Sequence, residues 1–322
     1  MPREYIHWKV ALQTLEELVR VYPQSDFTRL DRAMLLLGAV AHDAPYFYRL
    51  GRGKFSRVAE LLHGTHGDDT LEPLALFCEA ACQAPSGTHH DHRAFLLGLI
   101  THYSADIVLH PAVYYFTGNY YDSDPQRARA ARTQHRLLET CLDNHCALLW
   151  PNLAQLSLRA IVSELGGRTA VICESLGRAL PRSEQWLRAF FDFAACQRLF
   201  HSASAAAIMR RITALLPSRL SEYEALYSAG KRSKPGCFEA RFRFENPIDG
   251  KWGSANLEEL LQQAIEMSVG LAETVLVGSS DFAEIAQRVR SAKPGLSLSF
   301  GRPNAPVEQA HYFSSAPSPF LI

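Results

Sequence analysis

The sequence predicts an all-α protein built as a bundle of many helices, and three observations support this. Apolar residues recur at three- and four-residue intervals over most of the 322 residues, which is the pattern of amphipathic helices. Only residues 238–244 alternate in the manner of a short strand. Hydrophobic residues make up 47% of the chain and charged residues 20%, as in soluble globular proteins with a large core.

Charge and composition exclude several classes of protein. The formal net charge is zero, which argues against electrostatic capture of nucleic acid or of an anionic membrane. Residues 1–10 carry charges and no apolar run, so no signal peptide is expected. No stretch reaches the ~18 apolar residues of a membrane-spanning helix. The seven cysteines are scattered, without a Cys-x-x-Cys pair, which favours a reducing cytoplasm and argues against a thiolate metal site.

In the first half of the chain, the apolar periodicity predicts six helices. They are expected at residues 5–22, 31–40, 55–62, 71–82, 94–110 and 125–149. The fifth should end at His110, because Pro111 disfavours the helical conformation of the residue before it. Residues 84–92 (APSGTHHDH) are expected to form a solvated linker, and residues 114–124 an aromatic loop.

The second half is expected to be a largely helical extension. Helices are predicted at residues 154–165, 184–198, 205–216, 256–277 and 281–289. From about residue 292 the tail should be irregular and partly disordered. We therefore expect a metal-binding helical core at residues 1–150, with residues 151–322 packed on it.

The most informative stretch is the helix predicted at 94–110. His102, Asp106 and His110 are spaced four residues apart in it, so their side chains lie on one face. At a rise of ~1.5 Å per residue they form a ladder roughly 12 Å long. The apolar neighbours imply burial, and a buried carboxylate between two imidazoles requires compensation. A divalent metal would provide it; a buried hydrogen-bond network is the alternative.

Eleven of the thirteen histidines lie in residues 1–145, so imidazole chemistry is expected in the first half. His135 and Glu139 are again four residues apart, as two ligands of a metal site or as a surface hydrogen bond. Asp43 lies at a helix exit, either as a ligand or as an ordinary turn residue. His7 is near the start of the first helix, where a surface position is the alternative.

Two loops could line a pocket beside these residues. His63 and His66 share a glycine-containing loop, and either could be a ligand. The aromatic loop could stack on a ligand or hold a cationic group by cation–π contact, or it could simply pack against the end of the helix. The candidates for substrate contact are Tyr115, Asn119, Tyr120 and His66.

Two motifs, THYSADIVLHP at residues 101–111 and HRLLE at 135–139, stand in order behind His7, Asp43 and His63. With this order and spacing, residues 1–150 resemble the zinc-dependent phospholipase C family, as a bacterial member of cytoplasmic type. The resemblance implies an all-helical fold, shared with single-strand-specific zinc nucleases. It also implies a cluster of up to three zinc ions.

Carried over residue by residue, the resemblance implies three metal positions. The first ion would be held by Asp43, His63, His102 and Asp106. The second would be held by His110, His135 and Glu139, and the third by His7 with a bridging Asp106. His63 is preferred to His66 because it directly follows a helix.

Two zinc ions are expected and the third is less well supported. Secreted members of the family use their N-terminal residue as a ligand, whereas this chain starts six residues before His7. Secreted members also place two more residues between the aspartate and the last histidine of the central motif. The second position would therefore be shifted or partly rebuilt.

The function implied is zinc-dependent hydrolysis of a phosphodiester. Two metals ~3.5–4 Å apart can hold the attacking and leaving oxygens of a displacement at phosphorus. Asp106 would bridge the ions, and Asp43 would orient or deprotonate the attacking water. A phospholipid headgroup is the expected substrate, with nucleotides or other small phosphodiesters as the alternative. A helical binding or scaffold protein that keeps the metal without turnover is an alternative of another class.

Overall fold

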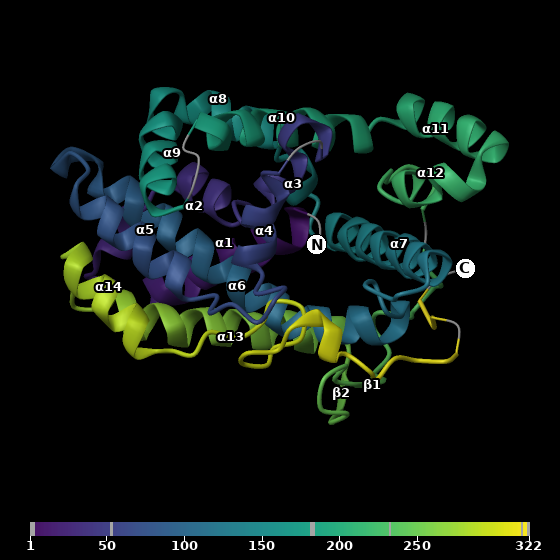
Figure 1. The fold of residues 1–322 in the computed structure, drawn as a ribbon. Coiled ribbons are helices and arrows are strands. Elements are labelled where there is room, and N and C mark those ends of the chain that lie inside the picture. Colours follow the sequence, from purple (N-terminus) through teal and green to yellow (C-terminus); the bar gives the residue numbers. More distant parts are fainter. Residues whose placement is uncertain (1–3, 52–53, 181–183, 232, 317, 321–322) are drawn as a thin grey trace.

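A computed structural model describes residues 4–51, 54–180, 184–231, 233–316 and 318–320. In these ranges the chain is a helical bundle with one small antiparallel sheet (Figure 1), which confirms the predicted fold class. The helices are α1 Glu4–Val21, α2 Arg32–Gly38, α3 Ala44–Phe47, α4 Ser56–Leu62, α5 Glu72–Cys82, α6 His89–Thr117, α7 Pro125–Leu149, α8 Leu158–Leu165, α9 Gly167–Ala179, α10 Glu184–Phe200, α11 Ala203–Leu215, α12 Pro217–Glu224, α13 Leu257–Leu276 and α14 Phe282–Ser291. The strands are β1 Phe242–Glu245 and β2 Trp252–Ala255.

The bundle is assembled around α6. Of the 29 residues of α6, 23 are buried, so this helix is covered on every side rather than along one apolar stripe. It contacts α1, α2, α7 and α13, and Figure 1 shows α13 running beneath it. A polar group on any face of α6 must therefore find its partners inside the protein.

Helices α2 and α6 meet backbone to backbone at two glycines. A Cβ atom on Gly98 would lie 2.3 Å from the carbonyl oxygen of Leu35, and one on Gly38 would lie 2.3 Å from that of Phe95. No larger residue fits at either position. This close approach also brings the carbonyl oxygen of Ala39 to within 2.8 Å of His102 Nδ1.

The prediction that the central helix ends at His110 is wrong, because α6 continues through Pro111 to Thr117. Pro111 has no N–H to donate to the carbonyl of Ile107. The backbone of Gly301 packs against that carbonyl, and a Cβ atom on Gly301 would lie 2.9 Å from it. The packing of other segments around α6 therefore stabilises a helix at Pro111 that the local sequence disfavours.

The prediction of a solvated linker at residues 84–92 is also wrong for residues 89–92. Helix α6 already begins at His89, and His92 is fully buried. The Nδ1–H of His92 donates to the carbonyl of Thr88, and its Nε2 accepts from the hydroxyl of Ser175, both at 2.8 Å. Ser175 lies on α9, and no pattern within residues 84–92 could have indicated it.

The helices predicted in the second half are present, although the first of them starts later, at Leu158. Helices α9 and α12 were not predicted. The predicted strand is shorter than expected and pairs with β2, which was also not predicted. The tail after residue 292 is largely irregular, as expected, but its side chains are packed: Leu298, Phe300 and Val307 are buried.

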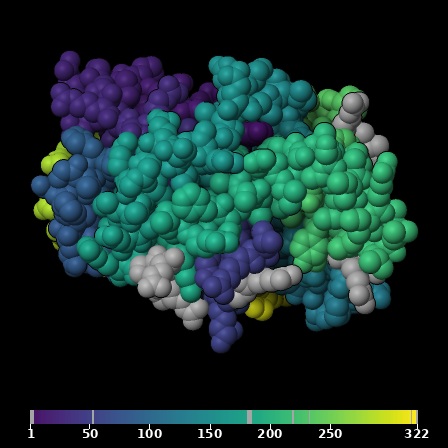
Figure 2. Space-filling view, turned by 90° about the horizontal axis from the view of Figure 1, so that it is seen from above, coloured from purple at the N-terminus to yellow at the C-terminus, as the bar shows by residue number. Residues whose placement is uncertain are grey.

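Helices α8 to α12 form an outer layer over the first helices. Helix α8 contacts α2, α9 contacts α5, and α12 contacts α7. Figure 2 shows these teal and green segments running across the upper face of the molecule. The division of the chain at residue 150 stays a prediction. Within the described ranges, no helix has the length and hydropathy needed to cross a lipid bilayer.

We predict that Gly98→Ala lowers the free energy of unfolding by about 1–3 kcal/mol, because the added methyl group must separate α2 from α6. Urea denaturation measures this. The matched control is Gly270→Ala in α13, where a Cβ atom meets nothing within 4 Å. That variant should be more stable by about 0.4–1 kcal/mol. Equal stability of the two variants would contradict the close helix contact.

Candidate metal centre

Asp106 lies at the point where the polar side chains converge. It is fully buried on α6. Its Oδ2 is 3.2 Å from His102 Nε2, 3.5 Å from His63 Nε2 and 3.6 Å from His110 Nδ1. Its Oδ1 is 3.6 Å from His7 Nε2. One carboxylate is thus surrounded by four imidazoles from three different parts of the chain.

A first cluster combines Asp43, His63 and His102, whose ligand atoms all lie within 4.8 Å of one another. Asp43 directly precedes α3 and His63 directly follows α4. The Oδ1 of Asp43 is 3.3 Å from His63 Nε2. His66 is not part of this cluster: its side chain is 61% exposed and lies near Glu60 instead.

A second cluster combines His110 with His135 and Glu139 of α7. The Oε1 of Glu139 is 3.0 Å from His135 Nε2 and 3.4 Å from His110 Nε2. All three side chains are buried. The four-residue spacing on α7 therefore turns both side chains inward toward α6, and they do not form a surface pair.

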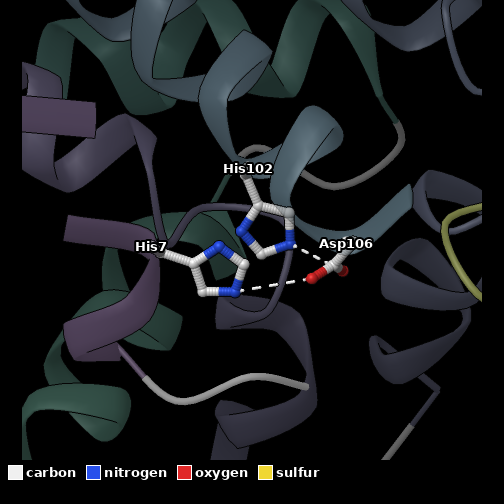
Figure 3. Close-up of side chains that lie close together, drawn as sticks. All are labelled: His7, His102 and Asp106. Atoms are coloured by element: carbon white, nitrogen blue, oxygen red, sulfur yellow. Dashed lines mark ion pairs between the residues drawn. The ribbon is translucent and has the colours of Figure 1, made fainter. Parts of the chain in front are cut away.

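A third cluster combines His7, His102 and Asp106 (Figure 3). The rings of His7 and His102 are stacked, with centroids 3.9 Å apart and planes 8° apart. The position of His7 is set by hydrogen bonds at the start of α1. The backbone N–H groups of Tyr5 and Ile6 donate to Oδ1 of Asp143 on α7, at 2.8 and 3.2 Å.

Three of these histidines are held by backbone carbonyls at Nδ1. His63 donates to Ala59 at 2.7 Å and His102 to Ala39 at 2.8 Å; His110 donates to Leu298 at 2.8 Å. A carbonyl can only accept, so Nδ1 carries a proton in all three rings and Nε2 is the atom turned toward the centre. This is how metal-binding histidines are oriented by their outer neighbours.

The donor atoms of the centre fit a metal ion. Several buried polar atoms of the described residues have no hydrogen-bond partner there: both ring nitrogens of His7, Nε2 of His63 and His102, Oδ1 of Asp43 and both carboxylate oxygens of Asp106. Leaving so many buried polar atoms unpaired is costly. Imidazole nitrogens and carboxylate oxygens without thiolates are ligands that suit zinc.

The histidines differ in their protonation. Burial is the main cause that lowers the pKa of His7 to about 3 and that of His135 to about 4. Burial also disfavours a charge on His63, but the nearby carboxylates of Asp106 and Asp43 outweigh it and raise its pKa to about 9. His63 must therefore release a proton when a metal binds, whereas His7 and His135 are already neutral.

The two central carboxylates stay ionised despite their burial. Burial alone would raise the pKa of Asp106, but His110 and His102 outweigh it and hold the pKa well below its usual range. His135 and His110 do the same for the pKa of Glu139. Both carboxylates are therefore in the form that binds a cation.

His42 precedes Asp43 at the same helix exit but was not among the predicted ligands. Its ring is fully buried and parallel to that of His102, with centroids 4.4 Å apart. His102 is thus held between the rings of His7 and His42. Neither ring nitrogen of His42 has a hydrogen-bond partner among the described residues. Adjacency to Asp43 was the only available signal.

The candidates for substrate contact are not equally placed. Tyr120 lies beside the second cluster, with its ring centroid 5.3 Å from that of His135. Tyr115 faces Trp252 of β2, and Asn119 accepts the backbone N–H of Tyr121 in a turn. Their roles stay predictions.

Two further tyrosines lie near the clusters: Tyr114, expected only as part of the aromatic loop, and Tyr46, which was not predicted. The ring centroid of Tyr114 is 4.7 Å from that of His135, and the ring centroid of Tyr46 is 5.6 Å from that of His63. Together with Tyr120 they form an aromatic wall, defined by residues 46, 114 and 120. This wall places apolar surface directly beside both clusters.

Comparison with known proteins gives one match. A family model described as zinc dependent phospholipase C matches residues 6–165, a range that contains every predicted ligand. This agrees with the resemblance carried by the two sequence motifs. No match was found among curated proteins or among solved structures.

We predict that zinc raises the melting temperature of the metal-free protein. A ligand at 100 times its Kd stabilises the folded state by about 2.7 kcal/mol. Asp106→Asn should lose most of this shift, because it removes the central negative charge. Differential scanning calorimetry with and without zinc measures it.

The control for this prediction is Asp281→Asn, which changes the N-cap of α14. Asparagine and aspartate cap helices about equally well, so the zinc-induced shift should be unchanged. A full shift in Asp106→Asn would contradict the central position assigned to this carboxylate.

Proposed function

Because the chain belongs to the zinc-dependent phospholipase C family, we propose that it is a zinc-dependent hydrolase of phosphodiester bonds. The observation that carries the proposal is that buried imidazoles and carboxylates from α1, α6, α7, the start of α3 and the end of α4 gather in three adjoining clusters along α6. A purely structural polar network would satisfy its own hydrogen bonds, and among the described residues this network does not.

We assign the ligands by cluster. Asp43, His63, His102 and Asp106 would hold one ion, and His110, His135 and Glu139 a second. His7 and Asp106 would hold a third, and the distance of 3.6 Å between their side chains supports this assignment. Because His102 belongs to two of the three geometric clusters, the first and third ions would lie close together.

Bound zinc supplies Lewis-acid polarisation of a phosphoryl oxygen and makes water acidic enough to attack near neutral pH. The side chains of the protein supply the base, the link between the clusters and the apolar surroundings. Asp43 Oδ1 makes no hydrogen bond of acceptable geometry with the described residues and lies 3.3 Å from Nε2 of His63. At this position Asp43 would orient the attacking water and accept its proton. Asp106 holds the two halves of the centre together. The aromatic wall limits access of bulk water to the reacting phosphorus.

We propose a phospholipid headgroup diester as the substrate. The description of the family supports a lipid-type substrate. The wall formed by Tyr46, Tyr114 and Tyr120 supports a substrate with a face that can pack on aromatic rings. We also propose a cytoplasmic location, on the ground that the seven cysteines are odd in number and five of them are buried in the core.

We expect the purified protein to hydrolyse bis-p-nitrophenyl phosphate, to lose this activity with a chelator and to regain it with zinc. Asp106→Ala should abolish turnover, because it removes the bridge between the clusters. The control His311→Ala changes an exposed histidine on the tail and should leave turnover unchanged. Release of p-nitrophenolate measures all of these.

A second assay tests the substrate. Release of phosphorylated headgroup from phosphatidylcholine in mixed micelles should exceed hydrolysis of nucleotide diesters under the same conditions. The reverse ranking would replace the lipid substrate by small phosphodiesters. Tight zinc binding without turnover of any diester would contradict the proposed hydrolase activity and favour a metal-stabilised binding protein.

A further inference from the structure

The tail of the chain passes directly over the metal centre. We call residues 295–301 the strap. All of them are buried except Leu296, which is partly buried. The strap follows α14 and has no regular secondary structure beyond one bridge between Leu296 and Pro303. It lies 130 residues beyond the end of the range that matches the family, residues 6–165.

Leu298 of the strap connects the two halves of the centre through its backbone. Its N–H donates to the carbonyl of His63 at 3.0 Å. Its carbonyl accepts from Nδ1–H of His110 at 2.8 Å. A single residue therefore contacts one member of the first cluster and one member of the second.

His110 depends on the strap in a way that the other histidines do not. The carbonyls that hold Nδ1 of His63 and His102 belong to Ala59 and Ala39, inside the family-matching range. The acceptor for His110 is Leu298. This bond fixes the proton on Nδ1 and turns Nε2 toward Glu139, 3.4 Å away.

The strap is itself held at both ends. At its start, the Thr70 hydroxyl donates to the carbonyl of Leu296 at 2.7 Å, and the N–H of Leu296 donates to the Tyr103 hydroxyl at 3.0 Å. At its end, the Asn246 amide donates to the carbonyl of Phe300 at 2.7 Å. Gly301 packs on the carbonyl of Ile107, where Pro111 leaves the helix ladder open.

We propose that the strap is a positioning element of the metal centre, and that Leu298 holds His110 in the tautomer and orientation that bind the second ion. The proposal rests on the proposed zinc chemistry. Outer partners of metal-binding histidines contribute about 10–100-fold to metal affinity. The second cluster is therefore complete only when residues 295–301 are in place.

Gly301→Ala tests the proposal. Gly301 has φ +62°, and a Cβ atom there would push the strap away from α6. The N–H of Gly301 also closes a turn onto Ser297, next to Leu298, at 2.8 Å, so the displacement should reach Leu298. The control is Gly278→Ala, where φ is +75° and a Cβ atom meets nothing within 4 Å.

We expect Gly301→Ala to weaken binding of the second zinc ion by about 10–100-fold, measured by competition with a chromophoric chelator. At saturating cobalt, its visible absorption spectrum should differ from that of the parent, because a reoriented imidazole changes the ligand field. Gly278→Ala should match the parent in both measurements. Parental affinity and spectrum in Gly301→Ala would overturn the proposal.

A second variant covers the case in which Gly301→Ala does not fold. Thr70→Val combined with Tyr103→Phe removes both hydrogen bonds to Leu296 and keeps the shape of both side chains. It should show the same loss of affinity for the second ion, and parental affinity would overturn the proposal. If the parent protein itself binds no zinc, the proposed function fails, an outcome distinct from failure of the strap.

Discussion

The burial of the Asp106 carboxylate is the constraint on which the rest of the molecule depends. An ionised carboxylate on a helix that is covered on all sides has no water to solvate it. The protein surrounds it with imidazoles from α1, α6 and the loop after α4. Removing such partners singly leaves an uncompensated charge. The close contact between α2 and α6 positions His102, and the anchoring of α1 by Asp143 positions His7.

Local helix geometry explains which parts of the site could be predicted. A spacing of four residues places His102 with Asp106, and His135 with Glu139, on common faces wherever the helices lie in space. Adjacency to a helix end was also informative, since His63 directly follows α4 and faces inward, while His66 is exposed. The order of these residues along the chain then indicated the family.

The features that could not be predicted depend on contacts between distant segments. In the helix through Pro111, Gly301 covers the open carbonyl of Ile107, and no short window of sequence contains both residues. The longer helix also changes how residues 114 and 115 are placed. Because α6 continues, Tyr114 lies one turn after His110 on the same face, whereas Tyr115 is rotated by ~100° away from the centre. The predicted loop at residues 114–124 gave no basis for distinguishing Tyr114 from Tyr115.

The strap is also synthesised after every candidate ligand of the metal centre. The chain leaves the ribosome from its N-terminus, and its early helices begin to fold before its end is made. The acceptor for His110 follows that residue by 188 positions. Every candidate ligand is therefore synthesised long before the segment proposed to orient the second cluster. A product that stops before residue 298 carries every candidate ligand and lacks the acceptor for His110, so the proposed role of the strap places maturation of the second cluster after synthesis of this segment.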